Sequence, residues 1–315
     1  MWSDALFLLL SMVMLTAGAE SLVMGSSSLA RRMGLTPLVA GLTVVAFGTS
    51  SPELVVSLDA AVTGHGDIAL GNVLGSNIFN IGIILGLTAV ICPVAVSLPL
   101  IRFDAPIMIA ASLLCVGLIG YGAFQRTAGL LLVVLLIAYT AFNIRMAKRQ
   151  GQEPVKLSET EGSSITRSIY LDIGLFGGGL GLLALGSHLL VLSAIDISRF
   201  LNVSEAVIGL TVVAAGTSMP ELATSILAAL RRHPDIAVGN VVGSNIFNIL
   251  GILGISSAIH PLSAKDIGMR DAWIMLAFAV AALPLLWTGR RLLRWEGAVL
   301  LLGYGAYLWV VWPAG

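Results

Sequence analysis

The sequence has 315 residues, of which 57% are hydrophobic and only 11% are charged, and its formal net charge is zero. Soluble domains carry about 25% charged residues, so this composition excludes an ordinary soluble protein and predicts one embedded in a lipid bilayer. The balanced charge indicates no nucleic-acid partner, and nothing in the sequence implies an obligatory protein partner.

Apolar segments of about 20 residues recur along the whole chain, and each is long enough to cross a hydrocarbon core of about 30 Å as a helix. The predicted fold class is therefore all-α and polytopic, with glycine-rich helices that pack closely in lipid. We predict ten transmembrane helices, near residues 4–24, 35–63, 66–92, 103–122, 127–146, 170–198, 203–230, 235–259, 271–288 and 295–312.

Two long stretches of the sequence recur at one fixed offset of 168 residues. GLTVVAFGTSSPEL at 41–54 returns as GLTVVAAGTSMPEL at 209–222, and DIALGNVLGSNIFNI at 67–81 returns as DIAVGNVVGSNIFNI at 235–249. A fixed offset of this kind indicates duplication of one structural unit. The predicted organisation is a first five-helix repeat, a connecting loop and a second five-helix repeat, at 1–147, 148–168 and 169–315.

The two predicted repeats should be inverted relative to each other. Because each holds an odd number of helices, the second must enter the membrane from the opposite side, as in many secondary transporters. With the N-terminus outside, thirteen Lys and Arg residues fall on the inner side and four on the outer side. The positive-inside rule therefore predicts both termini outside and the central loop in the cytoplasm. We predict that the protein lies in the cell inner membrane.

Both copies of the first motif place a proline inside an apolar helix. Pro52 and Pro220 remove a backbone donor and clash with the preceding turn, so helices 2 and 7 should break there. Carbonyl oxygens freed at membrane depth are tolerated only in a protein-lined or water-filled cavity. Carbonyls near Ala46 and Ala214 and four nearby hydroxyls would be oxygen ligands suited to a hard cation; the hydroxyls belong to Thr49, Ser50, Thr217 and Ser218.

A glutamate follows each of these prolines. Glu53 and Glu221 lie within membrane-spanning segments, where an ionisable side chain is costly and marks a candidate functional site. Two equivalent glutamates from inverted repeats can meet near the bilayer midplane, where their like charges repel unless a cation or proton intervenes. The pair therefore predicts a bound positive charge.

The second motif contributes a polar stripe in each half. Asn72, Ser76 and Asn80 are spaced by four residues and share one helical face, as do their counterparts Asn240, Ser244 and Asn248. With two carboxylates, hydroxyls, amides and carbonyls, the site could supply the six to eight oxygens that Ca²⁺ takes, or hold several Na⁺ instead. These ions would be transported substrates, and no cofactor is indicated.

At these motifs the sequence resembles the cation/calcium antiporter superfamily, in particular its sodium/calcium exchanger family and prokaryotic members. The resemblance implies a ten-helix inverted-repeat fold that exchanges entering Na⁺ for leaving Ca²⁺ by alternating access, with the first and sixth helices sliding. It implies Ca²⁺ ligands at Glu53 and Glu221 and at the backbone oxygens of Thr49 and Thr217. It implies Na⁺ sites at the Ala46 and Ala214 carbonyls and the side chains of Ser50, Ser218, Ser76 and Ser244, with Asn80 and Asn248 as the remaining central pair.

Several alternatives stay open at this point. Some prokaryotic members of the superfamily carry aspartate where this chain has Asn248, so the driving ion and stoichiometry are not determined. A proton/calcium exchanger or a potassium-dependent exchanger of the same fold ranks second, and a cation channel ranks lower. A hydrolase using Ser50 or Ser218 is disfavoured because the spanning segments hold no histidine base near either motif.

Overall fold

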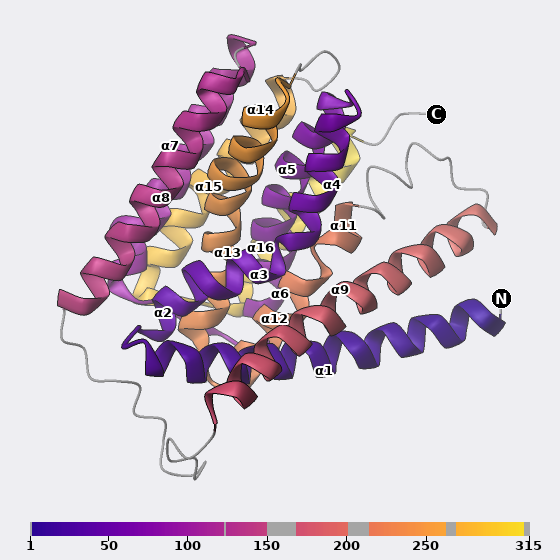
Figure 1. The fold of residues 1–315 in the computed structure, drawn as a ribbon, viewed down its shortest axis with the longest axis vertical. Helices are drawn as coiled ribbons and strands as arrows, with labels where there is room; N and C mark the ends of the chain where they lie inside the picture. The colour runs from indigo at the N-terminus through magenta and orange to yellow at the C-terminus, as the bar shows by residue number, and fades with distance from the viewer. Residues whose placement is uncertain (1, 123, 150–167, 201–213, 263–268, 312–315) are drawn as a thin grey trace.

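The computed structural model describes residues 2–122, 124–149, 168–200, 214–262 and 269–311, which are almost entirely helical (Figure 1). The first half contains α1 (Trp2–Arg32), α2 (Pro37–Ala40), the π-helix η1 (Gly41–Val45), α3 (Ala46–Thr49), α4 (Ser51–Val62), α5 (Gly66–Phe79), the π-helix η2 (Asn80–Leu85), α6 (Gly86–Ile91), β1 (Val94–Ala95), the π-helix η3 (Leu100–Asp104), α7 (Ala105–Gly120) and α8 (Arg126–Arg149).

The second half contains α9 (Ile169–Phe200), α11 (Ala214–Thr217), α12 (Met219–Leu230), α13 (Pro234–Phe247), the π-helix η5 (Asn248–Leu253), α14 (Gly254–Ile259), α15 (Met269–Trp287), the 3₁₀-helix η6 (Thr288–Arg290), β2 (Arg291–Leu292) and α16 (Arg294–Val311). Strands β1 and β2 pair antiparallel, with Val94 opposite Leu292, and so join connections from the two halves.

The described chain contains seven helical stretches that are long and apolar enough to cross a membrane, or eight if the bent helix made of α2 to α4 is counted. This confirms the prediction of an all-helical, multi-pass membrane protein. The total of ten spans stays a prediction. The 12-residue α12 is a shorter apolar helix, and residues 203–213 of the predicted seventh segment lie outside the described residues, as do residues 150–167 of the connecting loop.

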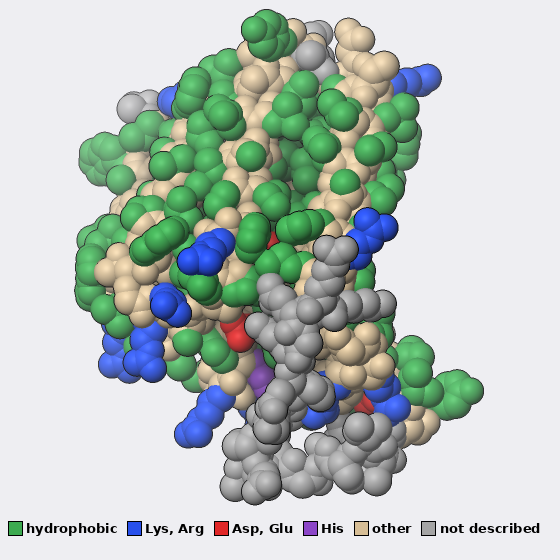
Figure 2. Space-filling model, turned by 90° about the vertical axis from the view of Figure 1, so that its left-hand side faces the viewer, with side chains coloured by type: hydrophobic (Ala, Val, Ile, Leu, Met, Phe, Trp, Pro, Cys, Tyr) green, Lys and Arg blue, Asp and Glu red, His purple; other side chains and the backbone are tan. Residues whose placement is uncertain are grey.

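The surface has the composition expected of a protein surrounded by lipid. Many large apolar side chains are exposed, among them Leu9, Ile137 and Leu302, each with more than 60% of its surface accessible. Figure 2 shows one face of the molecule, on which hydrophobic side chains cover most of the upper part and Lys and Arg gather mainly in the lower part. An extended apolar surface with charges concentrated towards one end fits a membrane-spanning body.

Helices α1 and α9 lie side by side across the lower part of the other helices in Figure 1. Glycines let their backbones approach closely: a Cβ at Gly25 would lie 2.6 Å from the backbone nitrogen of Phe176, and one at Gly179 would lie 2.7 Å from that of Leu22. Residue numbers rise along α1 as they fall along α9, so the two helices run antiparallel. Equivalent helices of inverted repeats are expected to have this relation.

The two halves are also packed into each other through two equivalent glycine contacts. A Cβ at Gly297 of α16 would lie 2.5 Å from the carbonyl oxygen of Gly86 in α6, and one at Gly129 of α8 would lie 2.7 Å from that of Gly254 in α14. Gly86 and Gly254 are related by the sequence offset of 168, as are Gly129 and Gly297. Helix α16 therefore packs against α6 of the first half, and α8 packs against α14 of the second half.

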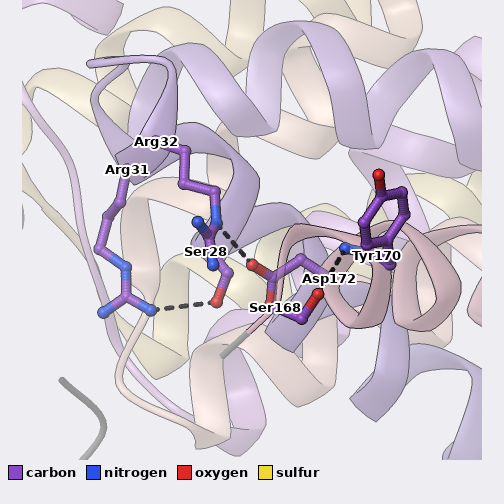
Figure 3. A network of polar contacts seen from close by, with 6 residues as sticks. All are labelled: Ser28, Arg31, Arg32, Ser168, Tyr170 and Asp172. Atoms are coloured by element: carbon purple, nitrogen blue, oxygen red, sulfur yellow. Dashed lines mark hydrogen bonds and ion pairs between the residues drawn. The ribbon is translucent and has the colours of Figure 1, made fainter. Parts of the chain in front are cut away.

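A polar network joins the end of α1 to the beginning of α9 (Figure 3). The Arg32 guanidinium donates to Asp172 Oδ2 at 2.7 Å, and the Asp172 side chain is fully buried while Arg32 is 26% exposed. Ser168 caps α9 by accepting a hydrogen bond from the Tyr170 backbone N–H at 3.3 Å, and Arg31 donates to Ser28 at 3.1 Å. The ion pair ties together the helices that the glycines bring close.

Replacing Arg32 with Gln should destabilise the protein, because it removes the positive partner of a buried carboxylate. Leaving a buried hydrogen-bonding group without its partner costs about 1–3 kcal/mol, and more when the group is charged, so we expect a lower thermal unfolding midpoint in detergent. The double variant Arg32→Gln/Asp172→Asn should recover part of this loss, since it leaves no buried charge. A double variant less stable than Arg32→Gln would contradict this account of the pair.

Candidate cation-binding site

The predicted helix break is present in both copies of the first motif. Ser50 has φ −80° and ψ 10°, and the helical stretches before and after it are bent by 48°. Ser218 has φ −89° and ψ 8° between α11 and α12. Proline stands in the first turn of both α4 and α12, where its missing N–H costs nothing. Each break therefore places the start of a new helix, with its glutamate in the first turn, inside the protein.

The carbonyl oxygen of Ala46 is less free than the sequence predicts. It accepts the backbone N–H of Ser50 at 3.0 Å and lies 3.4 Å from the hydroxyl of Thr49, because α3 continues helical bonding up to the break. The expectation of a carbonyl without a hydrogen-bond partner was wrong at this residue. In the second half, Ala214 is the first described residue after the gap at 201–213 and begins α11.

The two glutamates are both buried and are held by serines of the opposite half. The Ser50 hydroxyl donates to Glu221 Oε1 at 2.7 Å, and the Ser218 hydroxyl donates to Glu53 Oε1 at 2.9 Å. Glu53 and Glu221 are each 1% exposed and lie near enough for their charges to interact. The serine at each helix break therefore donates a hydrogen bond to the glutamate that follows the other break.

Asparagines hold each break against the neighbouring helix. Asn72 of α5 donates through Nδ2 to the Ser57 hydroxyl at 2.9 Å and to the carbonyl oxygen of Glu53 at 3.2 Å. Asn240 of α13 makes the equivalent contacts in the second half, to Ser225 at 3.0 Å and to the Glu221 carbonyl at 3.4 Å. These two asparagines therefore use their amide protons to fix the helices that carry the glutamates.

The remaining predicted residues of the two motifs are also buried in the protein. Thr49 donates to Asn240 Oδ1 at 3.2 Å, and the Ser76 hydroxyl lies 3.2 Å from that of Ser218, whose one proton is donated to Glu53. Buried positions are likewise found for the other predicted side chains, which are Thr217, Asn80, Ser244 and Asn248. The elements that carry these residues are α3, α4, α5 and η2 in the first half and α11, α12, α13 and η5 in the second. Figure 1 shows α3, α12 and α13 near the middle of the molecule.

Several buried oxygens in this region have no hydrogen-bond partner. They are Glu53 Oε2, Glu221 Oε2, Asn80 Oδ1, Asn248 Oδ1 and Ser244 Oγ. Among the Lys, Arg and His side chains whose burial the structure describes, none is buried. Buried polar atoms are normally satisfied, and buried charges are normally paired. A set of buried oxygens without hydrogen-bond partners, two of them from carboxylates, has the chemistry expected of a cation-binding site.

Two buried asparagines that contact this region were absent from the sequence-based site. Asn77 and Asn245 lie between the predicted serines and asparagines of each stripe and are 1% exposed. Their side chains contact the opposite half, through hydrogen bonds to Asn248 and Asn80. The helical spacing of four residues excluded them from the stripe, although the duplication of GSNIFN in both halves includes them.

Comparison with known proteins identifies the family. Residues 3–145 and 171–312 match the family described as "Sodium/calcium exchanger protein". The chain belongs to the sodium/calcium exchanger family. The resemblance seen at the duplicated motifs is therefore confirmed, and membership of this family makes the chain a transport protein rather than an enzyme.

Individual members of the family match over almost the full length. The sodium/calcium exchanger MaX1 of Methanosarcina acetivorans is 32% identical over 341 residues, which cover 97% of both chains. The inner membrane protein YrbG of Escherichia coli is 34% identical over 309 residues, covering 96% of this chain and 94% of its own. A solved structure of the sodium-calcium exchanger NCX_Mj matches with 30% identity, 98% coverage of both chains and a TM-score of 0.82.

Proposed function

We propose that this exchanger-family protein is a secondary active antiporter that exchanges Na⁺ for Ca²⁺ across the cell inner membrane by alternating access. The observation that carries the proposal is the pair of buried glutamates, Glu53 and Glu221, each bonded to a serine of the opposite half and each left with one unpartnered oxygen. Two such carboxylates supply two negative charges, which one Ca²⁺ or two Na⁺ would balance. Exchange of the two ions at one site would then keep the buried charge neutral.

The proposed ligands are the residues that the two motifs bring together. For Ca²⁺ they are Glu53 and Glu221 with the backbone oxygens of Thr49 and Thr217. For Na⁺ they are the Ala46 and Ala214 carbonyls with the hydroxyls of Ser50, Ser218, Ser76 and Ser244, and Asn80 and Asn248 complete the centre. The Ala46 carbonyl accepts a backbone hydrogen bond, but a carbonyl oxygen has two lone pairs, so one remains for an ion.

Neutral oxygens support Na⁺ over H⁺ as the driving ion. Proton exchange needs only titratable groups such as the two carboxylates, whereas a bound Na⁺ replaces its hydration shell with several protein oxygens. Unpartnered amide and hydroxyl oxygens at Asn80, Asn248 and Ser244 would serve Na⁺ and have no evident use in binding a proton. The amide at position 248 also gives the site one carboxylate fewer than members of the superfamily with aspartate there.

Alternating access requires a part of the protein that moves relative to the ion site. The antiparallel pair of α1 and α9 packs through close glycine contacts and lies outside the helices that carry the glutamates. We propose that this pair slides across the central helices, in a protein whose termini face outside and whose connecting loop faces the cytoplasm.

The proposal predicts that Ca²⁺ uptake into proteoliposomes needs an opposing Na⁺ gradient. With vesicles loaded in turn with Na⁺, K⁺ or protons in excess, radioactive Ca²⁺ should accumulate only in those loaded with Na⁺. Vesicles without protein give the background. Uptake driven by a proton gradient alone would instead assign the proton/calcium exchanger, a requirement for K⁺ together with Na⁺ would assign the potassium-dependent exchanger, and single-channel conductance steps would assign a channel.

A further inference from the structure

Four asparagines form a hydrogen-bonded cluster where α5 and η2 meet α13 and η5. Asn80 Nδ2 donates to Asn245 Oδ1 at 2.9 Å, and Asn248 Nδ2 donates to Asn77 Oδ1 at 3.0 Å. All four residues are 1% exposed. The cluster has the same twofold character as the sequence repeat, since Asn77 is equivalent to Asn245 and Asn80 to Asn248.

The orientation of two of these amides is determined by groups that can only accept. Asn77 Nδ2 lies 3.3 Å from the backbone carbonyl oxygen of Asn245 and 3.6 Å from the sulfur of Met275. Asn245 Nδ2 lies 3.3 Å from the carbonyl oxygen of Asn77 and 3.6 Å from the sulfur of Met108. Because a carbonyl oxygen and a thioether cannot donate, each amide nitrogen must face them, and each amide oxygen must face the other way.

This orientation determines that of Asn248 and Asn80 in turn. Asn77 Oδ1 faces Asn248, so Asn248 must present its NH₂ group, and a flipped amide would bring two acceptor oxygens to about 3 Å. The oxygen of Asn248 is then turned away, where it is buried and has no partner, and the same holds for Asn80. The backbone carbonyl of Asn245 therefore determines, through two successive hydrogen bonds, where the side-chain oxygen of Asn248 points. The backbone carbonyl of Asn77 does the same for Asn80.

The two unpartnered oxygens belong to residues that adjoin the helices of the glutamates. Asn248 begins η5, which packs against α4, the helix that carries Glu53; Asn80 begins η2, which packs against α12, the helix that carries Glu221. Both residues begin π-helical turns, a rare conformation that occurs frequently at functional sites.

We propose that Asn77 and Asn245 are positioning residues, which hold the amides of Asn248 and Asn80 so that their oxygens, and not their nitrogens, are available to the transported cation. The inference rests on the proposed function, since it assigns these oxygens to that cation site. Asn77 and Asn245 need not touch the ion. Asn77 acts through the amide of Asn248, and Asn245 acts through the amide of Asn80.

The test compares cation binding to purified full-length protein in Asn77→Leu, Asn245→Leu and the wild type. Binding of Ca²⁺ is measured with the radioactive ion, and binding of Na⁺ by its competition with Ca²⁺. Each variant should bind Ca²⁺ about 10- to 100-fold more weakly, the usual loss when a group that orients a metal ligand is removed. Asn143→Leu is the matched control: Asn143 is a buried asparagine of α8 whose amide donates to the Tyr139 carbonyl, and its affinity should match the wild type.

A further variant separates positioning from a general effect on folding. In an Asn248→Ala background, Asn77→Leu should cause no further loss.

The possible results have distinct meanings. Wild-type affinity in folded Asn77→Leu, or losses that add fully in the Asn248→Ala background, would overturn the positioning role while leaving the proposed antiport intact. Ca²⁺ binding without Na⁺-driven uptake in the wild type would overturn the antiport but not the positioning role. A wild-type protein that binds neither cation would overturn both.

Discussion

Replacing either Glu53 or Glu221 with Gln is expected to abolish Na⁺-dependent Ca²⁺ uptake. Glutamine keeps the size of the side chain and can still accept the serine hydroxyl of the opposite half, but it removes one of two negative charges. Since Ca²⁺ affinity depends strongly on the number of charged ligands, we expect a loss of about two orders of magnitude or more in apparent affinity, measured as Ca²⁺ flux against Ca²⁺ concentration.

The same variants should fold at least as well as the wild type in the absence of cations. Two buried like charges repel, and burial penalises each of them, so removing one relieves an unfavourable interaction. The thermal unfolding midpoint without Ca²⁺ and Na⁺ should stay the same or rise. Loss of flux with unchanged or increased stability is a result that a folding defect would not produce.

Glu296→Gln provides a matched control for these substitutions. Glu296 is also a fully buried glutamate, but it lies at the beginning of α16, where its Oε2 accepts the Leu293 backbone N–H at 2.7 Å. Glutamine can keep that bond, so flux should be retained. Uptake by Glu53→Gln or Glu221→Gln comparable to that of Glu296→Gln would show that the two glutamates do not hold the transported ion.

Replacing Gly243 with Ala is expected to lower both stability and transport. A Cβ at this position would lie 2.6 Å from the carbonyl oxygen and 2.7 Å from the Cα of Leu42 in η1. Backbone atoms cannot rotate away, so η1 would have to move from α13. Overpacking of this kind costs about 1–3 kcal/mol, which should lower the thermal unfolding midpoint in detergent.

Transport should fall as well, because the same interface positions the first break. Thr49, a few residues after η1, donates to Asn240 Oδ1 on α13 at 3.2 Å, and Ser50 next to it donates to Glu221. Moving η1 outward would stretch both bonds. Gly181→Ala in α9 is the control, since no atom beyond the adjacent backbone of α9 lies within 4 Å of its added Cβ. Equal stability and flux in the two variants would exclude this explanation.

Much of the candidate site could be predicted because its signals are local in the sequence. A proline inside an apolar segment breaks a helix wherever the segment lies in the fold, so Ser50 and Ser218 were expected at breaks. A glutamate within such a segment is costly unless it has a function, and its recurrence at an offset of 168 indicated a pair. The prediction failed at the Ala46 carbonyl, because a broken helix still makes its last backbone hydrogen bond.

The sequence by itself determined the membrane class, the duplication, the family motifs and the residue types at the site, because apolar length, spacing and proline chemistry act within one segment. Only the tertiary structure determined which side chains form hydrogen bonds with each other. Spacing along one helix does not show that Ser50 donates to Glu221 rather than to Glu53, or that Asn77 orients Asn248. Those hydrogen bonds join residues about 170 positions apart, so they depend on how the two halves pack against each other.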